Sequence, residues 1–140
     1  MENKITVMYI DKDDMILKEK EITNCYDSLR EIIGDTIEMP YLDAKIFDRE
    51  IDIMCDENAK LKSPTIKDLV AIVCDKKGQV LDIVYNNLIF LATDREEGDS
   101  ISLTESQKAF LLAYLSGSRA IMEDSKTHEQ KLVYVFQAER

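Results

Sequence analysis

The stretch from Leu69 to Gln107 constrains the fold most, because short apolar runs alternate in it with turn residues. It reads LVAIVCD-KKG-QVLDIVY-NN-LIFLATD-REEGD-SISLTESQ. Apolar, β-branched runs separated by short polar turns are typical of antiparallel strands. We therefore expect a three-strand meander that leads into a helix. The fold class that this predicts is α+β, with a mainly antiparallel sheet packed by about two helices.

The turn residues in this stretch indicate where its strands end. Lys76-Lys77-Gly78 supplies one tight turn, and Asn86-Asn87 can adopt positive φ for a second, two-residue turn. The alternative at Asn86-Asn87 is a bulge within one long bent strand. Leu88 to Leu91 is apolar on both faces, which predicts a central or helix-covered strand. Thr104 to Gln107 (TESQ) has the capping-box pattern that starts a helix.

The N-terminal third predicts a β-hairpin and a helix. Lys4 to Ile10 alternates in hydrophobicity, Asp11 to Asp14 forms an acidic turn, and Met15 to Ile22 is extended again. Asn24 can cap a helix that runs to about Ile33. Gly34 then follows as the residue that ends it in a left-handed conformation.

The remaining segments carry weaker signals. Thr36 to Leu42 reads as a strand that either forms an edge or ends at Pro40, which has no N–H for pairing, and Ile51 to Cys55 reads as a short strand. Asp56 to Pro64 is polar and reads as a loop.

The chain length of 140 residues fits one domain over residues 1–140. We expect its core at about 4–122, a charged loop at 123–131 and a C-terminal strand at 132–137. Leu132 to Phe136 would dock on the sheet or form its edge. As an edge, it could pair with a second copy and make a homodimer.

The charge balance restricts the class of partner. Eighteen basic and 28 acidic side chains give a formal charge of −10. Such an excess repels nucleic acids and anionic membranes, so we expect no direct contact with either and a preference for basic proteins. The alternative interpretation is that the charge serves solubility.

The cysteines and the hydropathy pattern indicate a soluble, cytoplasmic protein. Cys25, Cys55 and Cys74 are odd in number and dispersed, unlike a disulfide framework. Cys74 lies in an apolar run and should be buried. We see no signal peptide and no apolar run of about 20 residues that could span a membrane.

No residue pattern predicts catalysis, a metal site or a cofactor, and we expect a protein that is not an enzyme. His128 is the sole histidine and lies in a polar run, which predicts a solvated loop position. Asp11 to Asp14 resembles a calcium loop, but Ile16 and Ile22 stand where an EF-hand needs Gly and Glu. The four glycines are isolated, so no phosphate-binding loop is expected.

Acidic side chains gather in two places. The densest cluster lies just after the third expected strand, and the second group is Asp43, Asp48, Glu50, Asp52, Asp56 and Glu57. Carboxylates on a rigid sheet can imitate the charge spacing of a phosphate backbone and be steered to basic grooves. The alternative is a solubilising turn beside a solvated sheet face. The expected partner-binding residues are Asp94, Glu96, Glu97, Asp99, Asp48, Glu50 and Asp52.

Four segments resemble a family of small acidic proteins from phages and Gram-positive bacteria that is catalogued as a domain of unknown function. They are YDSLREIIGDTIE (26–38), CDENAKLK (55–62), AIVCDKKGQVLDIVYNNLIFLATD (71–94) and EEGDSISLTESQ (96–107). The resemblance covers about four-fifths of the chain, and the residues after Gly117 fall outside it. It implies an accessory protein of a mobile element and supplies no catalytic residues.

Charge and resemblance together predict a non-enzymatic inhibitor of a host defence protein that handles nucleic acid, of anti-CRISPR or antirestriction type, with DNA mimicry as one mode. It would act in the host cytoplasm and bind a basic nuclease or effector. One alternative is a small-ligand module whose pocket between sheet and helix is lined by Tyr85, Tyr114 and Phe110. Another is an uncharacterised enzyme-regulatory domain.

Overall fold

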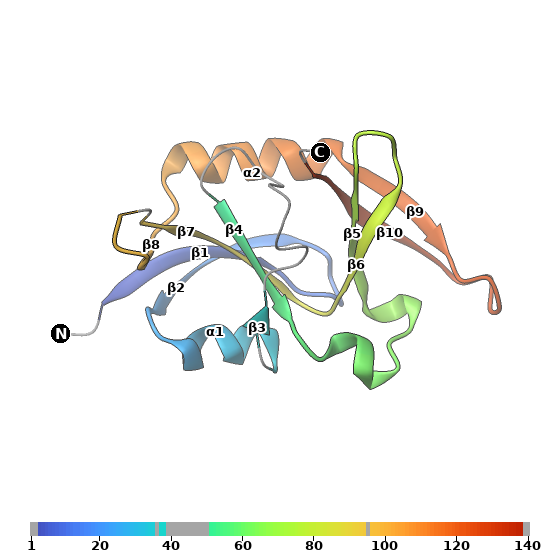
Figure 1. Ribbon diagram of the computed structural model, residues 1–140, viewed down its shortest axis with the longest axis horizontal. Helices are drawn as coiled ribbons and strands as arrows, with labels where there is room; N and C mark the ends of the chain where they lie inside the picture. The colour runs from blue at the N-terminus through green and yellow to red at the C-terminus, as the bar shows by residue number, and fades with distance from the viewer. Residues whose placement is uncertain (1–2, 36, 39–50, 95, 139–140) are drawn as a thin grey trace.

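The computed structural model describes residues 3–35, 37–38, 51–94 and 96–138 (Figure 1). In chain order the strands are β1 (Lys4–Ile10), β2 (Leu17–Thr23), β3 (Ile37–Glu38), β4 (Ile51–Asp56), β5 (Leu69–Cys74), β6 (Val80–Tyr85), β7 (Leu88–Thr93), β8 (Ser100–Ile101), β9 (Arg119–Glu123) and β10 (Gln130–Gln137). The helices are α1 (Tyr26–Ile33), α2 (Glu105–Gly117) and two short 3-10 helices, η1 (Ala59–Lys62) and η2 (Ile66–Asp68).

The described strands form two sheets. The larger has the order β2-β1-β7-β4-β3, with β8 also paired to β7, and the smaller has the order β6-β5-β10-β9. The β5–β10 pair is parallel, and the other described pairs are antiparallel. The predicted α+β class with a mainly antiparallel arrangement is confirmed.

Alternating side chains give the larger sheet two buried faces. Ile5 and Val7 of β1 face α1, where they pack with Leu29 and Ile33. Met8 and Ile10 of β1 belong to the core cluster on the opposite face. Successive side chains of β7 also point to opposite faces of the sheet, and both faces are buried, which explains why Leu88 to Leu91 is apolar throughout. The prediction of a central, helix-covered strand is confirmed.

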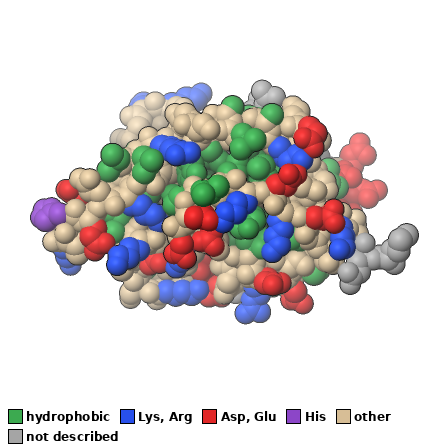
Figure 2. All heavy atoms as spheres, turned by 180° about the vertical axis from the view of Figure 1, so that it is seen from behind, with side chains coloured by type: hydrophobic (Ala, Val, Ile, Leu, Met, Phe, Trp, Pro, Cys, Tyr) green, Lys and Arg blue, Asp and Glu red, His purple; other side chains and the backbone are tan. Residues whose placement is uncertain are grey.

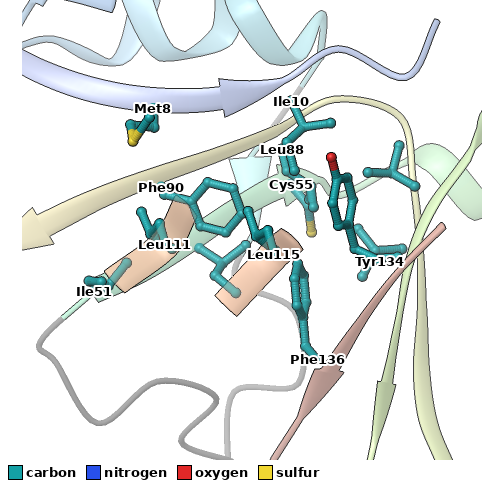
Figure 3. Packing of buried hydrophobic residues seen from close by; sticks show 14 of the residues in the cluster. Met8, Ile10, Ile51, Cys55, Leu88, Phe90, Leu111, Leu115, Tyr134 and Phe136 are labelled. Atoms are coloured by element: carbon teal, nitrogen blue, oxygen red, sulfur yellow. The ribbon is translucent and has the colours of Figure 1, made fainter. Parts of the chain in front are cut away.

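The main core lies between the larger sheet, the smaller sheet and α2. Leu111 and Leu115 of α2 are buried against Phe90 of β7 and Phe136 of β10 (Figure 3). The two phenylalanine rings meet edge to face, with centroids 6.1 Å apart. Thr104 caps α2 through the predicted reciprocal pair with Gln107. The capping box therefore sets where α2 begins, and its packed apolar face holds it against the core.

The N-terminal hairpin and α1 form largely as predicted. β1 and β2 pair over their full length, and Gly34 ends α1 at φ +91°. The helix begins one residue later than expected, because Cys25 is the N-cap and the Asn24 amide donates to the Ser100 carbonyl instead.

The expected three-strand meander is wrong at its second turn. β5 and β6 form a hairpin whose turn has Gly78 at φ +83°, but β6 does not pair with β7. At Asn86 and Asn87 the chain leaves the smaller sheet and enters the larger one, where β7 pairs with β1 and β4. The residues therefore make a corner between sheets, which is neither the expected hairpin turn nor a bulge within one sheet.

The C-terminal region also differs from expectation. β10 lies between β5 and β9 and has a partner on each side, so the interpretation of Leu132 to Phe136 as a free edge is wrong. The charged loop expected at 123–131 is a shorter turn over residues 124–129, because β9 ends at Glu123 and β10 begins at Gln130. β9 itself was not expected as a strand.

The middle of the chain supplies one central and one edge strand. β4 lies between β7 and β3, as a longer strand than predicted, and β3 is at the end of the sheet path. The prediction of an edge strand here is confirmed for Ile37–Glu38, while Pro40 lies outside the described residues. Part of the expected loop at 56–64 forms η1.

Candidate partner-binding surface

The acidic cluster forms the turn between β7 and β8. The Asp94 amide donates to the Asp99 carbonyl, and the Gly98 amide donates to the Asp94 carbonyl, each at 2.7 Å. The carboxylate of Asp94 accepts hydrogen bonds from the backbone amides of Glu96 at 2.9 Å and Glu97 at 3.4 Å. Asp94 therefore closes the turn from within.

The other three carboxylates of this turn face solvent. Glu96, Glu97 and Asp99 are all exposed, and none of them takes part in an ion pair that the structure records between described residues. They project from a turn held at both ends by strand pairing of β7 with β8. We name Glu96, Glu97 and Asp99 the acidic turn.

The structure brings Asp52 to the base of the acidic turn. Asp52 lies on β4 opposite Leu91 of β7, and its carboxylate accepts a hydrogen bond from the Thr93 hydroxyl. It is half-buried, so it contributes charge to this end of the sheet while holding β4 to β7. Asp48 and Glu50, the other predicted site residues, lie outside the described residues.

Many other described carboxylates are already matched by lysines. Lys60 pairs with Asp82 at 2.5 Å, and Lys108 pairs with Glu19 at 2.5 Å and with Glu105 at 2.7 Å. Glu105 and Glu19 together raise the pKa of Lys108. On the face drawn in Figure 2, acidic and basic side chains are interspersed. The acidic turn differs from these pairs because no described cation neutralises it.

A second polar constellation, which the sequence did not reveal as a unit, lies at the corner between the sheets. Asp56, whose side chain is 1% exposed, accepts hydrogen bonds from the Asn58 amide, the Lys62 ammonium and the Asn86 side chain, each at 2.9 Å. Lys62 also pairs with Asp35. The hydrogen bonds that Lys62 donates to the carboxylates of Asp35 and Asp56 raise the pKa of Lys62. We name this set the corner network.

The corner network continues to the N-terminal hairpin. Asn86, at φ +70°, accepts from Lys12 at 3.3 Å, and Lys12 pairs with Asp68 at 2.8 Å. The Lys12 ammonium is the main cause of the lowered pKa of Asp68. Asn87 accepts from the Lys12 amide and donates to the Ile32 carbonyl, each at 2.9 Å.

The corner network joins segments that are far apart in the sequence but close in the fold. Two of them, residues 55–62 and 85–87, belong to stretches that carried the family resemblance. The resemblance of these two segments to one family could therefore have indicated from the sequence that they are related in the fold. We read this network as structural, because its central carboxylate is buried and satisfied by hydrogen bonds.

The predicted aromatic pocket does not form. Phe110 and Tyr114 contact each other with ring centroids 5.7 Å apart, and they line an open hollow on the outer side of α2 with Ser106, Ala109 and Ala113. Tyr85 lines a separate space of about 10 Å³ beside Asp56 and Ala59. On the inner side of α2, Leu111 and Leu115 are buried in the main core.

Another hollow lies between α2, the β1–β2 turn and strands β9 and β10. Its volume is about 400 Å³. It is mainly apolar, with the Arg119 guanidinium over the Tyr134 ring at 5.2 Å as its cationic wall. The Tyr134 hydroxyl donates to the Met15 carbonyl at 2.5 Å and is therefore occupied.

The cysteines and the histidine are dispersed. Cys55 and Cys74 are buried, as predicted for Cys74, and Cys25 is exposed with its pKa lowered by the Ser28 hydroxyl. His128 is exposed in the β9–β10 turn, which confirms its predicted loop position. Within the described ranges, no group of three or more His, Cys, Asp or Glu side chains is arranged to hold a metal ion. The helices described there are too short or too polar to cross a membrane.

Comparison with protein families matches residues 5–116 to the family described as Domain of unknown function (DUF3846). The chain belongs to the DUF3846 family. The matched range includes the acidic turn, the corner network and α2 up to its penultimate residue, whereas β9 and β10 follow it. No curated protein and no solved structure matches the chain. The expected membership of a family of unknown function is confirmed, and the DUF3846 match assigns no activity.

Proposed function

We propose that this DUF3846 protein is a non-enzymatic accessory protein of a phage or other mobile element that binds and inhibits a host defence protein acting on nucleic acid. The binding surface is the acidic turn, with Asp52 at its base. The partner is a basic CRISPR effector or restriction enzyme in the host cytoplasm.

The exposure and lack of a described cation partner at the acidic turn carry this proposal. Glu96, Glu97 and Asp99 stand on a turn pinned by β7 and β8, so their positions are fixed before any partner arrives. A preorganised array of like charges is attracted to a cationic groove over a distance of about 8 Å at physiological salt. The formal charge of −10 adds to this steering.

The described part of the array is short, which favours a local contact over mimicry of a long duplex. Asp94 is turned inward and Asp52 is bonded to Thr93, so three carboxylates remain fully presented. A longer array would need Asp48 and Glu50, which lie outside the described residues.

The test measures DNA cleavage by a panel of purified CRISPR nucleases and restriction enzymes from Gram-positive bacteria. The triple variant E96Q/E97Q/D99N removes three charges while keeping side-chain size. Its matched control, E21Q/E31Q/E129Q, removes three charges at exposed positions elsewhere. We expect the wild-type protein to slow cleavage by one of these enzymes, and the acidic-turn variant to need about ten-fold more protein for the same effect.

Salt dependence separates the mechanism from generic inhibition. Inhibition through the acidic turn should weaken as the salt concentration rises from roughly 0.05 to 0.3 M. Equal potency of the two triple variants, or inhibition that is constant with salt, would remove the acidic turn from the mechanism. A protein that leaves the whole panel unaffected would contradict the proposed function itself.

A second candidate function, a small-ligand module, is favoured by the 400 Å³ hollow beside Arg119. The charged residues that line it are Arg119 and Asp14, and Asp14 is paired with Lys18, so the Arg119 cation and the apolar walls suit a small apolar acid. Ligand-observed NMR with aromatic carboxylic acids tests it, with Leu112→Lys at the mouth as the blocking variant. Binding that L112K leaves unchanged would place the ligand elsewhere.

A further inference from the structure

Among the described strands, β9 stands at the end of the smaller sheet, and its pairing with β10 shows which of its backbone groups point outward. The register places Ile121 opposite Leu132. Beyond the two ends of β9, the Val135 amide donates to the Ser118 carbonyl and the Asp124 amide to the Glu129 carbonyl. Antiparallel pairs alternate between hydrogen-bonded and non-hydrogen-bonded, so Ala120 and Met122 bond to β10. The N–H and C=O groups of Arg119, Ile121 and Glu123 therefore point outward.

The same three residues also present their side chains to solvent. Arg119, Ile121 and Glu123 are exposed, whereas Ala120 and Met122 are half-buried on the opposite face. Ile121 is 66% exposed, and its cross-strand neighbour Leu132 is 48% exposed. An apolar pair at a free strand edge is a site where another strand can add.

The sequence of β9, RAIME, is complementary to itself when reversed. If a second β9 runs antiparallel with Ile121 opposite Ile121, then Arg119 of each copy lies opposite Glu123 of the other. Directly opposed residues of unlike charge stabilise a strand pair, and a two-fold axis repeats each contact. The outward backbone groups of these residues meet in the same register, which gives about six hydrogen bonds.

We propose that the β9 edge is a self-association surface on which a second copy of this chain adds its own β9. The two smaller sheets then join through an antiparallel β9–β9 pair into one continuous sheet across the axis. Leu132 extends the apolar contact on each side of the paired isoleucines, toward the hollow that Leu112 and Ile16 line.

The sheet ends at β2 and β6 fit this role less well. β2 reads LKEKEIT, and in a two-fold antiparallel pair a residue lies opposite one that differs from it by an even number of positions. In β2 such registers set Lys18 opposite Lys20 or Glu19 opposite Glu21, so like charges meet. β6 has an irregular register against β5. β9 combines a regular edge with opposite charges at its ends.

Sedimentation velocity on the full chain tests the register. We expect the wild-type protein to dimerise, and R119E and E123R each to weaken association about ten-fold or more, because each homodimer then opposes like charges twice. An equimolar mixture of R119E with E123R should recover the dimer, since every opposed pair is again Glu with Arg. Circular dichroism confirms that each variant is folded.

Two further variants separate the β9 edge from the rest of the surface. V80K adds a charge at the opposite edge of the same sheet, on an exposed residue, and should leave the dimer unchanged. I121K sets two lysines across the axis and should abolish association without touching the intramolecular contact of Arg119 with Tyr134. A wild-type protein that is still monomeric at roughly 0.1 mM would overturn the proposal, because a dissociation constant above that concentration is too weak for a specific interface. So would a mixture of the charge variants that stays monomeric.

Discussion

Removing the carboxylate at the centre of the corner network should destabilise the protein strongly. In Asp56→Ala, the backbone amide of Asn58 and the side-chain amide of Asn86 lose the buried carboxylate that accepts their hydrogen bonds. A buried donor left without a partner costs about 1–3 kcal/mol. Lys62 is half exposed and keeps its ion pair with Asp35, so the loss of its bond to Asp56 adds little. We expect a fall of about 3 kcal/mol in the free energy of unfolding.

Urea unfolding measured by circular dichroism checks this magnitude. With a slope of about 2 kcal/mol per molar urea, the midpoint of D56A should fall by about 1.5 M. The matched control is Glu57→Ala, which removes the adjacent carboxylate from an exposed position and should change stability by less than about 0.5 kcal/mol.

A double variant tests whether the hydrogen bonds act as one network. Asn86 contacts both Asp56 and Lys12, so the effects of D56A and N86A should sum to more than the effect of the double variant. A midpoint for D56A within about 0.3 M of that for E57A would refute the assignment of the corner network as a structural element.

Two further predictions follow from the described contacts. The pKa of Asp68 is lowered in the folded state by Lys12, so its contribution to stability is complete above its unfolded pKa of about 3.9 and is lost as pH falls through the folded pKa. The difference in urea midpoint between wild type and D68N should therefore be constant above about pH 5 and shrink at lower pH; an unchanged difference would contradict the Lys12 contact. Leu111→Ala should cost about 2–5 kcal/mol by thermal unfolding, because Leu111 is fully buried, and Leu112→Ala, at 51% exposure, less than about 1 kcal/mol. Equal losses would mean that the described face of α2 is misassigned.

Local patterns in the sequence predicted the elements whose causes are local. The Thr104–Gln107 capping box, the left-handed Gly34 and the hairpin of β1 with β2 depend on residues a few positions apart. The two-faced burial of β7 was also predictable, because an uninterrupted apolar run has no wet side. These parts of the fold are confirmed.

Strand partners were not predictable, because a period of two gives the face of a strand and not its neighbour. Asn86-Asn87 has the composition of a hairpin turn, yet its side chains bond to Asp56, Lys12 and Ile32, which lie at least 30 residues away. Those distant contacts turn the chain into the other sheet. β9 was not predicted because its five residues are of mixed polarity and lie at an edge, where they bury too little apolar surface to give a strand pattern in the sequence.

The candidate site was predictable in location and less so in its parts. The run DREEGD between strands marked an acidic turn from the sequence alone. That Asp94 closes the turn while Glu96 and Glu97 remain exposed depends on backbone geometry. That Asp52 joins them depends on the register of β4 with β7. Neither relation leaves a trace in local composition.

The position of the family match separates the two proposals. The DUF3846 match ends at residue 116, within α2, whereas β9 and β10 follow it. β10 is nevertheless integral to the core, because Phe136 is fully buried against Phe90 and β10 pairs in parallel with β5. The acidic turn lies inside the matched range, so a role for it extends to DUF3846 relatives that carry the same run of acidic residues. The edge formed by Arg119, Ile121 and Glu123 lies outside that range, so the DUF3846 match does not extend self-association to the relatives. Loss of dimerisation in E123R with inhibition retained would therefore show that the two surfaces act independently.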